Sequence, residues 1–156
     1  MKIRRAIKED SEFLFNLRNK PEVRLASWNS RLVEFPVHQK WLVATLSNPR
    51  RALYVAENES GLQIGQVRYD TEREGAAEIG VSVMSEHFGK GYGTKILVES
   101  AKIFFAEFPR INKIVAHIKF DNPVSVRVFS KAGYSAPIIV KYEGHDCQEM
   151  ILTRLD

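Results

Sequence analysis

The chain has 156 residues, of which 44% are hydrophobic and 27% are charged. This length and composition fit a single domain, 1–156, and exclude a largely disordered chain. The 23 basic and 19 acidic residues leave a net charge of +4, which suits an anionic ligand or nucleic acid. The basic residues are scattered and are not interleaved with aromatic ones, so nucleic-acid binding is the weaker hypothesis and we expect none.

Several site classes have no support in the composition. Cys147 is the single cysteine, which excludes an intrachain disulfide and a cysteine-rich zinc site. The histidines and carboxylates show no metal-ligand spacing, and His117 and His145 receive no role. The apolar runs are far shorter than the about 20 residues of a membrane-spanning helix. The charged N-terminus lacks an apolar signal core. We therefore expect a cytoplasmic protein that needs no metal and no membrane.

The first third of the chain predicts two helices. One spans 12–19 and follows polar capping residues. The other spans 36–48 and opens at a proline, which is a favourable first-turn residue. The apolar spacing of the second helix predicts that Val37, Trp41 and Ala44 face inward.

The remaining two thirds predict a meander of strands followed by alternating helices and strands. Short turns join the first three strands, which indicates antiparallel pairing. The order α-α-β-β-β-α-β-α-β-β predicts one α/β domain of the α+β type, with a mixed, mostly antiparallel sheet flanked by helices. The expected strands are 51–57, 62–70, 76–84, 111–120, 137–142 and 147–155, and the expected helices are 94–108 and 123–132.

A glycine-rich loop, Gly89-Lys90-Gly91-Tyr92-Gly93, precedes the helix 94–108. The first N–H groups of a helix lack internal partners, and the helix dipole favours an anion there. Glycines let the backbone approach a phosphate closely, and Lys90 adds a positive charge. The loop therefore predicts a phosphate cradle. It matches neither a Walker A loop nor a Rossmann fingerprint, because both the residue order and the preceding antiparallel strands differ.

Three segments together resemble the GNAT superfamily of acyl-CoA-dependent N-acetyltransferases: 77–83 (AEIGVSV), 88–94 (FGKGYGT) and 122–134 (NPVSVRVFSKAGY). The resemblance implies a GNAT fold over nearly the whole chain. It also implies direct acetyl transfer from acetyl-CoA to a primary amine in a ternary complex. Loop N–H groups would hold the pyrophosphate, and the strand 76–84 would pair with pantetheine. The implied coenzyme-binding residues are Val81, Val83, Phe88, Gly89, Lys90, Gly91, Tyr92, Gly93, Thr94, Asn122, Ser125 and Phe129.

The acid–base residues are less clear from this resemblance. Phe129 stands where many members have a tyrosine that protonates the leaving thiolate, and phenylalanine has no proton to give. Ser125, Tyr134 or water is the alternative donor. Glu78, between apolar neighbours on the donor strand, is the first candidate for the base that neutralises the amine. An outward or structural role for Glu78 stays open, and His38 is the second candidate.

The first two helices and their loop resemble two branches of the superfamily. One acetylates nucleotide-linked aminosugars, as in pseudaminic acid biosynthesis, and the other acetylates the N-termini of ribosomal proteins. Cations and aromatic rings suit a sugar nucleotide. A non-catalytic acetyl-CoA sensor is a further alternative, supported by Phe129, and the expected oligomeric state is a monomer or homodimer. The candidate acceptor-binding residues are Arg18, Asn19, Trp28 and His38.

Overall fold

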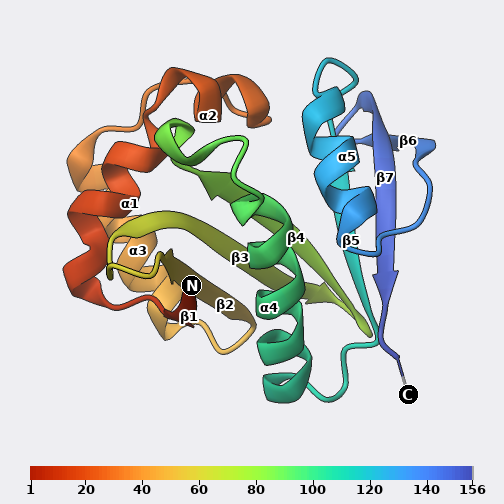
Figure 1. The fold of residues 1–156 in the computed structure, drawn as a ribbon, viewed down its shortest axis with the longest axis horizontal. Helices are drawn as coiled ribbons and strands as arrows, with labels where there is room; N and C mark the ends of the chain where they lie inside the picture. The colour runs from red at the N-terminus through yellow and green to blue at the C-terminus, as the bar shows by residue number, and fades with distance from the viewer. Residues whose placement is uncertain (156) are drawn as a thin grey trace.

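The computed structural model describes residues 1–155, which fold around one seven-stranded sheet of order β1-β2-β3-β4-β5-β7-β6 (Figure 1). All neighbouring strands are antiparallel except β4 and β5, which run parallel. The strands are β1 Lys2–Arg5, β2 Arg51–Glu57, β3 Gln63–Arg73, β4 Ala76–Val83, β5 Lys113–Ile118, β6 Ile138–Tyr142 and β7 His145–Thr153. The helices are α1 Ser11–Arg18, α2 Pro21–Ala26, α3 Phe35–Ser47, α4 Tyr92–Glu107 and α5 Pro123–Lys131, with short 3-10 turns at Lys8–Asp10 and Ser85–His87.

The predicted fold class is confirmed, and the structure adds two elements to the predicted order. Strand β1 pairs with β2 as an edge strand, although its sequence is mostly charged. Arg4 on this strand forms a two-point ion pair with Asp10, with both N···O distances at 2.8 Å. Helix α2 has only six residues and begins at Pro21, which the sequence predicted to lie beyond the end of a helix. Its length is below what local spacing can reveal.

The sheet is covered on both faces, because its strands alternate side chains between two cores. On β2, Leu53 and Val55 pack with Leu14 of α1 and Leu42 of α3. The intervening residues, including Tyr54, join the larger core that contains α4. Helices α1 and α3 therefore lie on one face of the sheet and α4 on the other.

The inward face of α3 differs from the predicted one. Val37 is 59% exposed and Ala44 is exposed as well, whereas Trp41 is half-buried. The buried positions are His38, Leu42 and Thr45, which follow the helical spacing with two polar members. Apolar spacing alone missed this face because it discounts a buried histidine and threonine.

Strands β4 and β5 pair over a short stretch and then part. Only Ala76, Ala77 and Glu78 of β4 have register partners on β5. Residues 79–83 of β4 pair with β3 alone, and residues 116–118 of β5 pair with β7 alone. Figure 1 shows the two strands meeting near the C-terminal end of the chain and separating from there. We call residues 79–83 the free edge of β4.

Gly65 permits the close approach of β3 to β4. A Cβ there would lie 2.7 Å from the carbonyl oxygen of Ser82 and 3.2 Å from Cδ1 of Ile96. We expect Gly65→Ala to lower the free energy of unfolding by about 1–3 kcal/mol in urea titrations, because the strands must separate. Gly80→Ala is the matched control in the same sheet, since its Cβ would meet only the movable end of Arg68, at 3.3 Å from Nη2. Equal stability of the two variants would contradict this packing.

Candidate active site

The glycine-rich loop leads directly into α4, as predicted. Gly89 has φ +76° and Gly91, the N-cap residue of α4, has φ +78°. Residues with a Cβ rarely adopt this left-handed conformation, so the backbone requires glycine at both positions. No atom lies within 4 Å of where either Cβ would stand. Phe88, Gly89 and Lys90 are exposed, so the loop backbone is open to a ligand.

The loop follows the open end of β4, and this placement fits coenzyme A, the ligand that the resemblance implies. The N–H groups at the start of α4 can hold phosphates. The free edge of β4 offers unpaired backbone groups to an extended chain such as pantetheine. Val81 and Val83 lie on this edge, and their side chains pack against the core that contains α4. Tyr92 donates from its hydroxyl to Oε2 of Glu59 at 3.0 Å, and Thr94 is half-buried in the first turn.

Helix α5 packs closely against α4. A Cβ on Gly93 would lie only 3.2 Å from Cγ1 of Val128, so glycine at this position lets the two helices approach. The side chain of Asn122 accepts a hydrogen bond from the backbone N–H of Ser125 at 3.2 Å. Asn122 thereby caps α5, and its contact with a coenzyme stays a prediction.

Phe129, which occupies the position of the expected acid, and the alternative donors Tyr134 and Ser125 differ in burial. Phe129 is only 4% exposed and packs edge-to-face on Tyr134, with the ring centroids 4.8 Å apart. Burial raises the pKa of Tyr134 well above its ordinary value, and its hydroxyl has no partner among the described residues. Its burial therefore makes Tyr134 a less suitable proton donor than a hydroxyl closer to the surface. Ser125 is half-buried in the first turn of α5, so it is better placed than Tyr134 to donate a proton to the thiolate.

Glu78 occupies the point where β4 and β5 part, within a cluster of polar side chains. The Tyr142 hydroxyl donates to Oε1 of Glu78. Nδ1 of His117 lies 3.8 Å from the same oxygen, and Nε2 of His117 lies 2.9 Å from Oε2 of Glu149. The rings of His117 and Tyr142 stack with their centroids 4.1 Å apart. These contacts give Glu78 a structural role, which it can have together with a catalytic one.

This cluster shifts the pKa values of its members in opposite directions. Burial raises the pKa of Glu78, but His117 and the Tyr142 hydroxyl outweigh it, and the pKa is lowered. Burial lowers the pKa of His117, but the carboxylates of Glu78 and Glu149 outweigh it, and the pKa is raised. Glu78 is thus ionised and able to accept a proton.

Sequence reasoning missed His117, Tyr142 and Glu149. The signal is the register of β5 on β7, which places His117 opposite Glu149. No spacing along the chain contains this register, because the two residues belong to different strands.

Trp28 lies in the loop after α2 and reaches the hairpin of β6 and β7. Its ring centroid is 5.5 Å from that of Tyr142 and 6.1 Å from that of His145. The ammonium of Lys119 lies 5.7 Å from the Trp28 centroid and donates to the carbonyl of Leu25 at 3.0 Å. The N-terminal helices are therefore tied to the C-terminal hairpin beside Glu78. Trp28 is 37% exposed, so part of its ring is left for a ligand.

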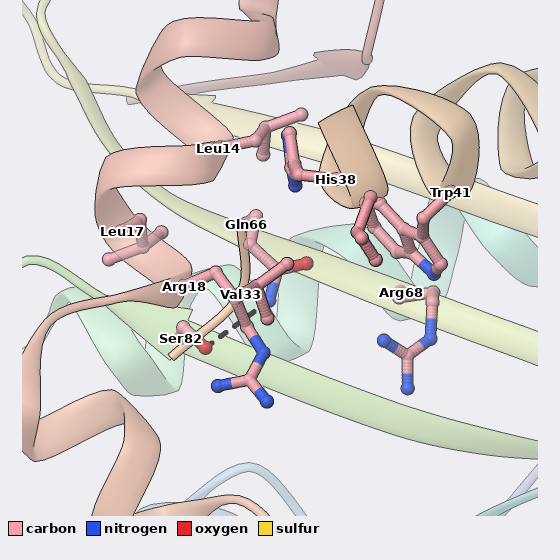
Figure 2. A pocket seen from close by; sticks show the side chains of 10 residues that line it. Leu14, Leu17, Arg18, Val33, His38, Trp41, Gln66, Arg68 and Ser82 are labelled. Carbon is pink, nitrogen blue, oxygen red and sulfur yellow. Dashed lines mark hydrogen bonds between the residues drawn. The ribbon is translucent and has the colours of Figure 1, made fainter. Parts of the chain in front are cut away.

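A pocket of about 230 Å³ lies on the face of the sheet that α1 and α3 cover (Figure 2). It contains two of the predicted acceptor-binding residues, Arg18 and His38. Asn19 does not line it, because its side chain makes two 2.8 Å hydrogen bonds with the backbone of Val33 and so fixes the pocket wall. The lining residues are Leu14, Leu17, Arg18, Val33, Val37, His38, Trp41, Gln66, Arg68 and Ser82.

His38 keeps a chemistry compatible with its predicted role. Burial lowers its pKa, although a backbone hydrogen bond with Ser11 partly opposes this. The ring is therefore neutral at neutral pH, and its Nε2 is buried with no partner among the described residues. A neutral imidazole nitrogen in a pocket wall can accept a proton or a hydrogen bond.

The pocket and Glu78 share one face of the sheet, whereas Val81 and Val83 point to the other. Glu78, Gly80 and Ser82 alternate along β4, and Ser82 lines the pocket. Arg68 lines it as well, and its charge contributes to lowering the pKa of Glu78. Two ligands can thus meet at β4 from opposite faces, one from the glycine-rich loop and one from the pocket.

Two other kinds of site find no residues in the described part of the chain. Among the side chains that the structure describes, those of residues 1–71 and 73–155, there is no group of three or more His, Cys, Asp or Glu placed to bind a metal ion. None of the helices described in these residues is both long and apolar enough to cross a membrane.

Comparisons with known proteins identify the family and agree with the fold. Residues 1–135 match the family described as acetyltransferase (GNAT) domain. Among solved structures, an aminoglycoside acetyltransferase in complex with coenzyme A and kanamycin has a TM-score of 0.83 and 22% identity, covering 98% of this chain and 94% of its own. Spermidine N-acetyltransferase from Vibrio cholerae, in complex with CoA and spermine, has a TM-score of 0.84 and 18% identity over 97% and 94%.

A third structure is the ribosomal-protein-alanine N-acetyltransferase from Brucella melitensis, with a TM-score of 0.77 and 24% identity over 99% of this chain and 100% of its own. At these identities the three structures establish the fold alone. No curated protein matches the sequence.

The raised pKa of His117 predicts a pH-dependent stability. A histidine with a raised folded pKa stabilises the fold fully below its unfolded pKa, about 6.5, and loses this contribution as the pH rises through the folded pKa. We expect His117→Gln to lower the free energy of unfolding by about 1–3 kcal/mol near pH 6, with a smaller deficit near pH 9. Urea titrations across this range measure it. His145→Gln, at the exposed histidine that begins β7, is the control, and a pH-independent deficit would contradict the charged pair.

Proposed function

The chain belongs to the GNAT acetyltransferase family, and we propose that it transfers an acetyl group from acetyl-CoA to a primary amine by direct attack in a ternary complex. The observation that carries the proposal is the parting of β4 from β5 at Glu78, with the glycine-rich loop at the other end of the free edge. An extended thioester along this edge brings its acetyl group close to a carboxylate. The bound coenzyme A of two structural neighbours supports the same donor.

The donor would be held mainly by backbone groups. Residues 88–94 direct their N–H groups at the pyrophosphate, and Lys90 adds a charge that can move toward it. The free edge of β4 pairs with pantetheine, and one of its N–H groups polarises the thioester carbonyl. The first turn of α5, with Asn122 and Ser125, forms the opposite wall.

The acceptor amine would approach from the pocket face and lose its proton before attack. Glu78 is the proposed base, and Tyr142 and His117 hold its carboxylate in place and ionised. His38 is the second candidate because its ring is neutral and its Nε2 is unpartnered among the described residues. Ser125 or water protonates the departing thiolate, whose pKa of about 8.5 makes it an acceptable leaving group without a dedicated acid.

We propose a nucleotide-linked aminosugar as the acceptor. Arg18 supplies a cation for phosphate, and Trp28 supplies a partly exposed ring beside Glu78. Two alternatives have specific support. The ribosomal-protein-alanine N-acetyltransferase among the neighbours favours a protein N-terminus. The burial of both Phe129 and Tyr134 favours a sensor that binds acetyl-CoA without transfer, because neither ring can act as an acid in the cleft.

Release of free CoA thiol tests the reaction. The purified protein is incubated with acetyl-CoA and, separately, a 4-amino-4,6-dideoxy nucleotide sugar, a ribosomal-type N-terminal peptide and spermidine. We expect release with the nucleotide sugar. Release with the peptide alone replaces the proposed acceptor and keeps the chemistry. Tight acetyl-CoA binding with no release from any amine supports the sensor.

Replacement of the proposed base tests the role of Glu78. We expect Glu78→Gln to lower kcat about 10²- to 10⁴-fold with little change in the KM for acetyl-CoA. The residual rate should rise with pH, because solvent then supplies the neutral amine. Glu99→Gln, an exposed carboxylate on α4, is the control. A kcat near that of the wild type would transfer the role to His38 or to water.

Distortion of the glycine-rich loop tests coenzyme binding separately. Gly91→Ala places a Cβ on a residue at φ +78°, so the loop must move. We expect the Kd for CoA, measured calorimetrically, to rise about tenfold. Gly144→Ala imposes the same strain at φ +78° in the turn between β6 and β7 and should leave the Kd unchanged. Equal effects of both variants would show that strain acts on the fold and not on the ligand.

A further inference from the structure

The pocket on the α1 and α3 face has an unusual charge for a site that would receive an amine. Among the described residues, its lining includes two arginines, Arg18 and Arg68, and no carboxylate. We infer that this pocket binds an anionic group of the acceptor, a phosphate or a carboxylate, and rejects acceptors whose charges are all positive. The inference rests on the proposed function, which it deepens by naming the acceptor class and the residues that select it.

Arg18 is a cation built into the pocket wall with bonding capacity to spare. It ends α1, and its Nη2 donates to the carbonyl of Asn29 at 2.7 Å. Its Nη1 is buried and has no partner among the described residues. Burial lowers the pKa of Arg18, and the neighbouring charges of Arg68 and Arg24 lower it further. A buried guanidinium nitrogen without an acceptor is costly, so an anion in the pocket that accepts a hydrogen bond from Nη1 would remove this cost.

Arg68 adds a second guanidinium that is only partly neutralised. Its Nε lies 3.1 Å from Oδ2 of Asp70, whose Oδ1 lies 2.7 Å from Nε of Arg51. One carboxylate thus serves two arginines. The guanidinium of Arg68 lies across Gly80 on β4, where a Cβ would stand 3.3 Å from Nη2. Glycine at position 80 therefore leaves the space that this arginine occupies.

The two guanidinium groups face the same region. Figure 2 shows both extending to one side of the pocket, away from His38 and Leu14. Guanidinium forks match the paired oxygens of phosphates and carboxylates, and two forks can hold one anion together. An all-cationic amine would instead meet two positive charges, and among the described residues the carboxylate paired with them is Asp70, which Arg68 shares with Arg51.

The rest of the pocket limits the size and character of the acceptor. Leu14, Leu17 and Trp41 supply apolar walls. Gln66 of β3 donates to the hydroxyl of Ser82 on β4 at 3.2 Å, which links the two strands within the pocket lining. The pocket volume of about 230 Å³ is below the about 300–1,000 Å³ of typical small-molecule pockets. The pocket therefore suits a small anionic head with a short ring or apolar part, and any larger portion of the acceptor extends outside it.

Two pairs of amines that differ by one anionic group test the inference. Glucosamine 6-phosphate is compared with glucosamine, and phenylalanine with phenylalaninamide, with spermidine as the all-cationic probe. We expect the anionic member of at least one pair to have a kcat/KM at least about tenfold above its partner, and spermidine to be the poorest substrate. The pair that shows the preference identifies phosphate or carboxylate as the source.

Variants locate the preference in the pocket. Arg18→Gln and Arg68→Gln should each lower kcat/KM about 10- to 100-fold more for the anionic probe than for its neutral partner, mainly through KM, and leave CoA binding unchanged. Arg18→Lys keeps the charge and should retain part of the preference, which guards against a folding defect in the glutamine variant. Arg110→Gln removes an exposed arginine outside the pocket and should behave as the wild type.

The outcomes separate this inference from the proposed function. Turnover with no anion preference in either pair, a preference for spermidine, or an equal loss in Arg110→Gln overturns the inference and leaves the acetyltransferase intact. If no amine releases thiol, calorimetric titration with each anionic probe tests whether the pocket binds an anion. If an anionic probe binds to the wild type and not to Arg18→Gln, the anion site stands and the transfer reaction is overturned. Absence of binding by both anionic probes overturns both.

Discussion

Strands β4 and β5 exchange backbone hydrogen bonds over only three register pairs, from Ala76 to Glu78, and then lose contact. A parallel pair in the middle of a sheet normally continues, because unpaired backbone groups are costly when they are buried. Here the flanking strands secure each partner separately, since β3 follows β4 to Val83 and β7 follows β5 to Ile118. The sheet can therefore open at its centre without losing its cohesion. Both the proposed donor edge and the polar cluster at Glu78 depend on this opening.

The two faces of the sheet would bind different substrates, the donor on the α4 side and the acceptor on the side of α1 and α3. On the α4 side, glycine conformation and helix N–H groups create a place for an anion with little help from side chains. On the side of α1 and α3, selectivity would come from side chains, with Arg18 and Arg68 set against apolar walls. This division explains why the donor half of the site is carried by a short motif, whereas the acceptor half is assembled from α1, α3 and two strands.

The sequence therefore predicted more of the donor half of the site than of the acceptor half. The glycine-rich loop, the cap at Asn122 and the meander of β2, β3 and β4 were predictable, because each depends on neighbours in the chain. The buried face of α3 was not, since His38 is held by packing against other elements and not by apolar spacing. The cluster of Glu78, His117, Tyr142 and Glu149 was not predictable either, because its members belong to four strands and meet only through register.

The positions of the two tryptophans have a spectroscopic consequence. Trp28 contacts the hairpin beside Glu78, Trp41 lines the arginine-containing pocket, and the chain has no third tryptophan. Both indole rings thus report on the face that would receive the amine, and neither belongs to the glycine-rich loop. Tryptophan fluorescence is therefore expected to report binding of the acceptor and not binding of the coenzyme. It allows acceptor occupancy to be followed in the unmodified protein while the coenzyme concentration is varied independently.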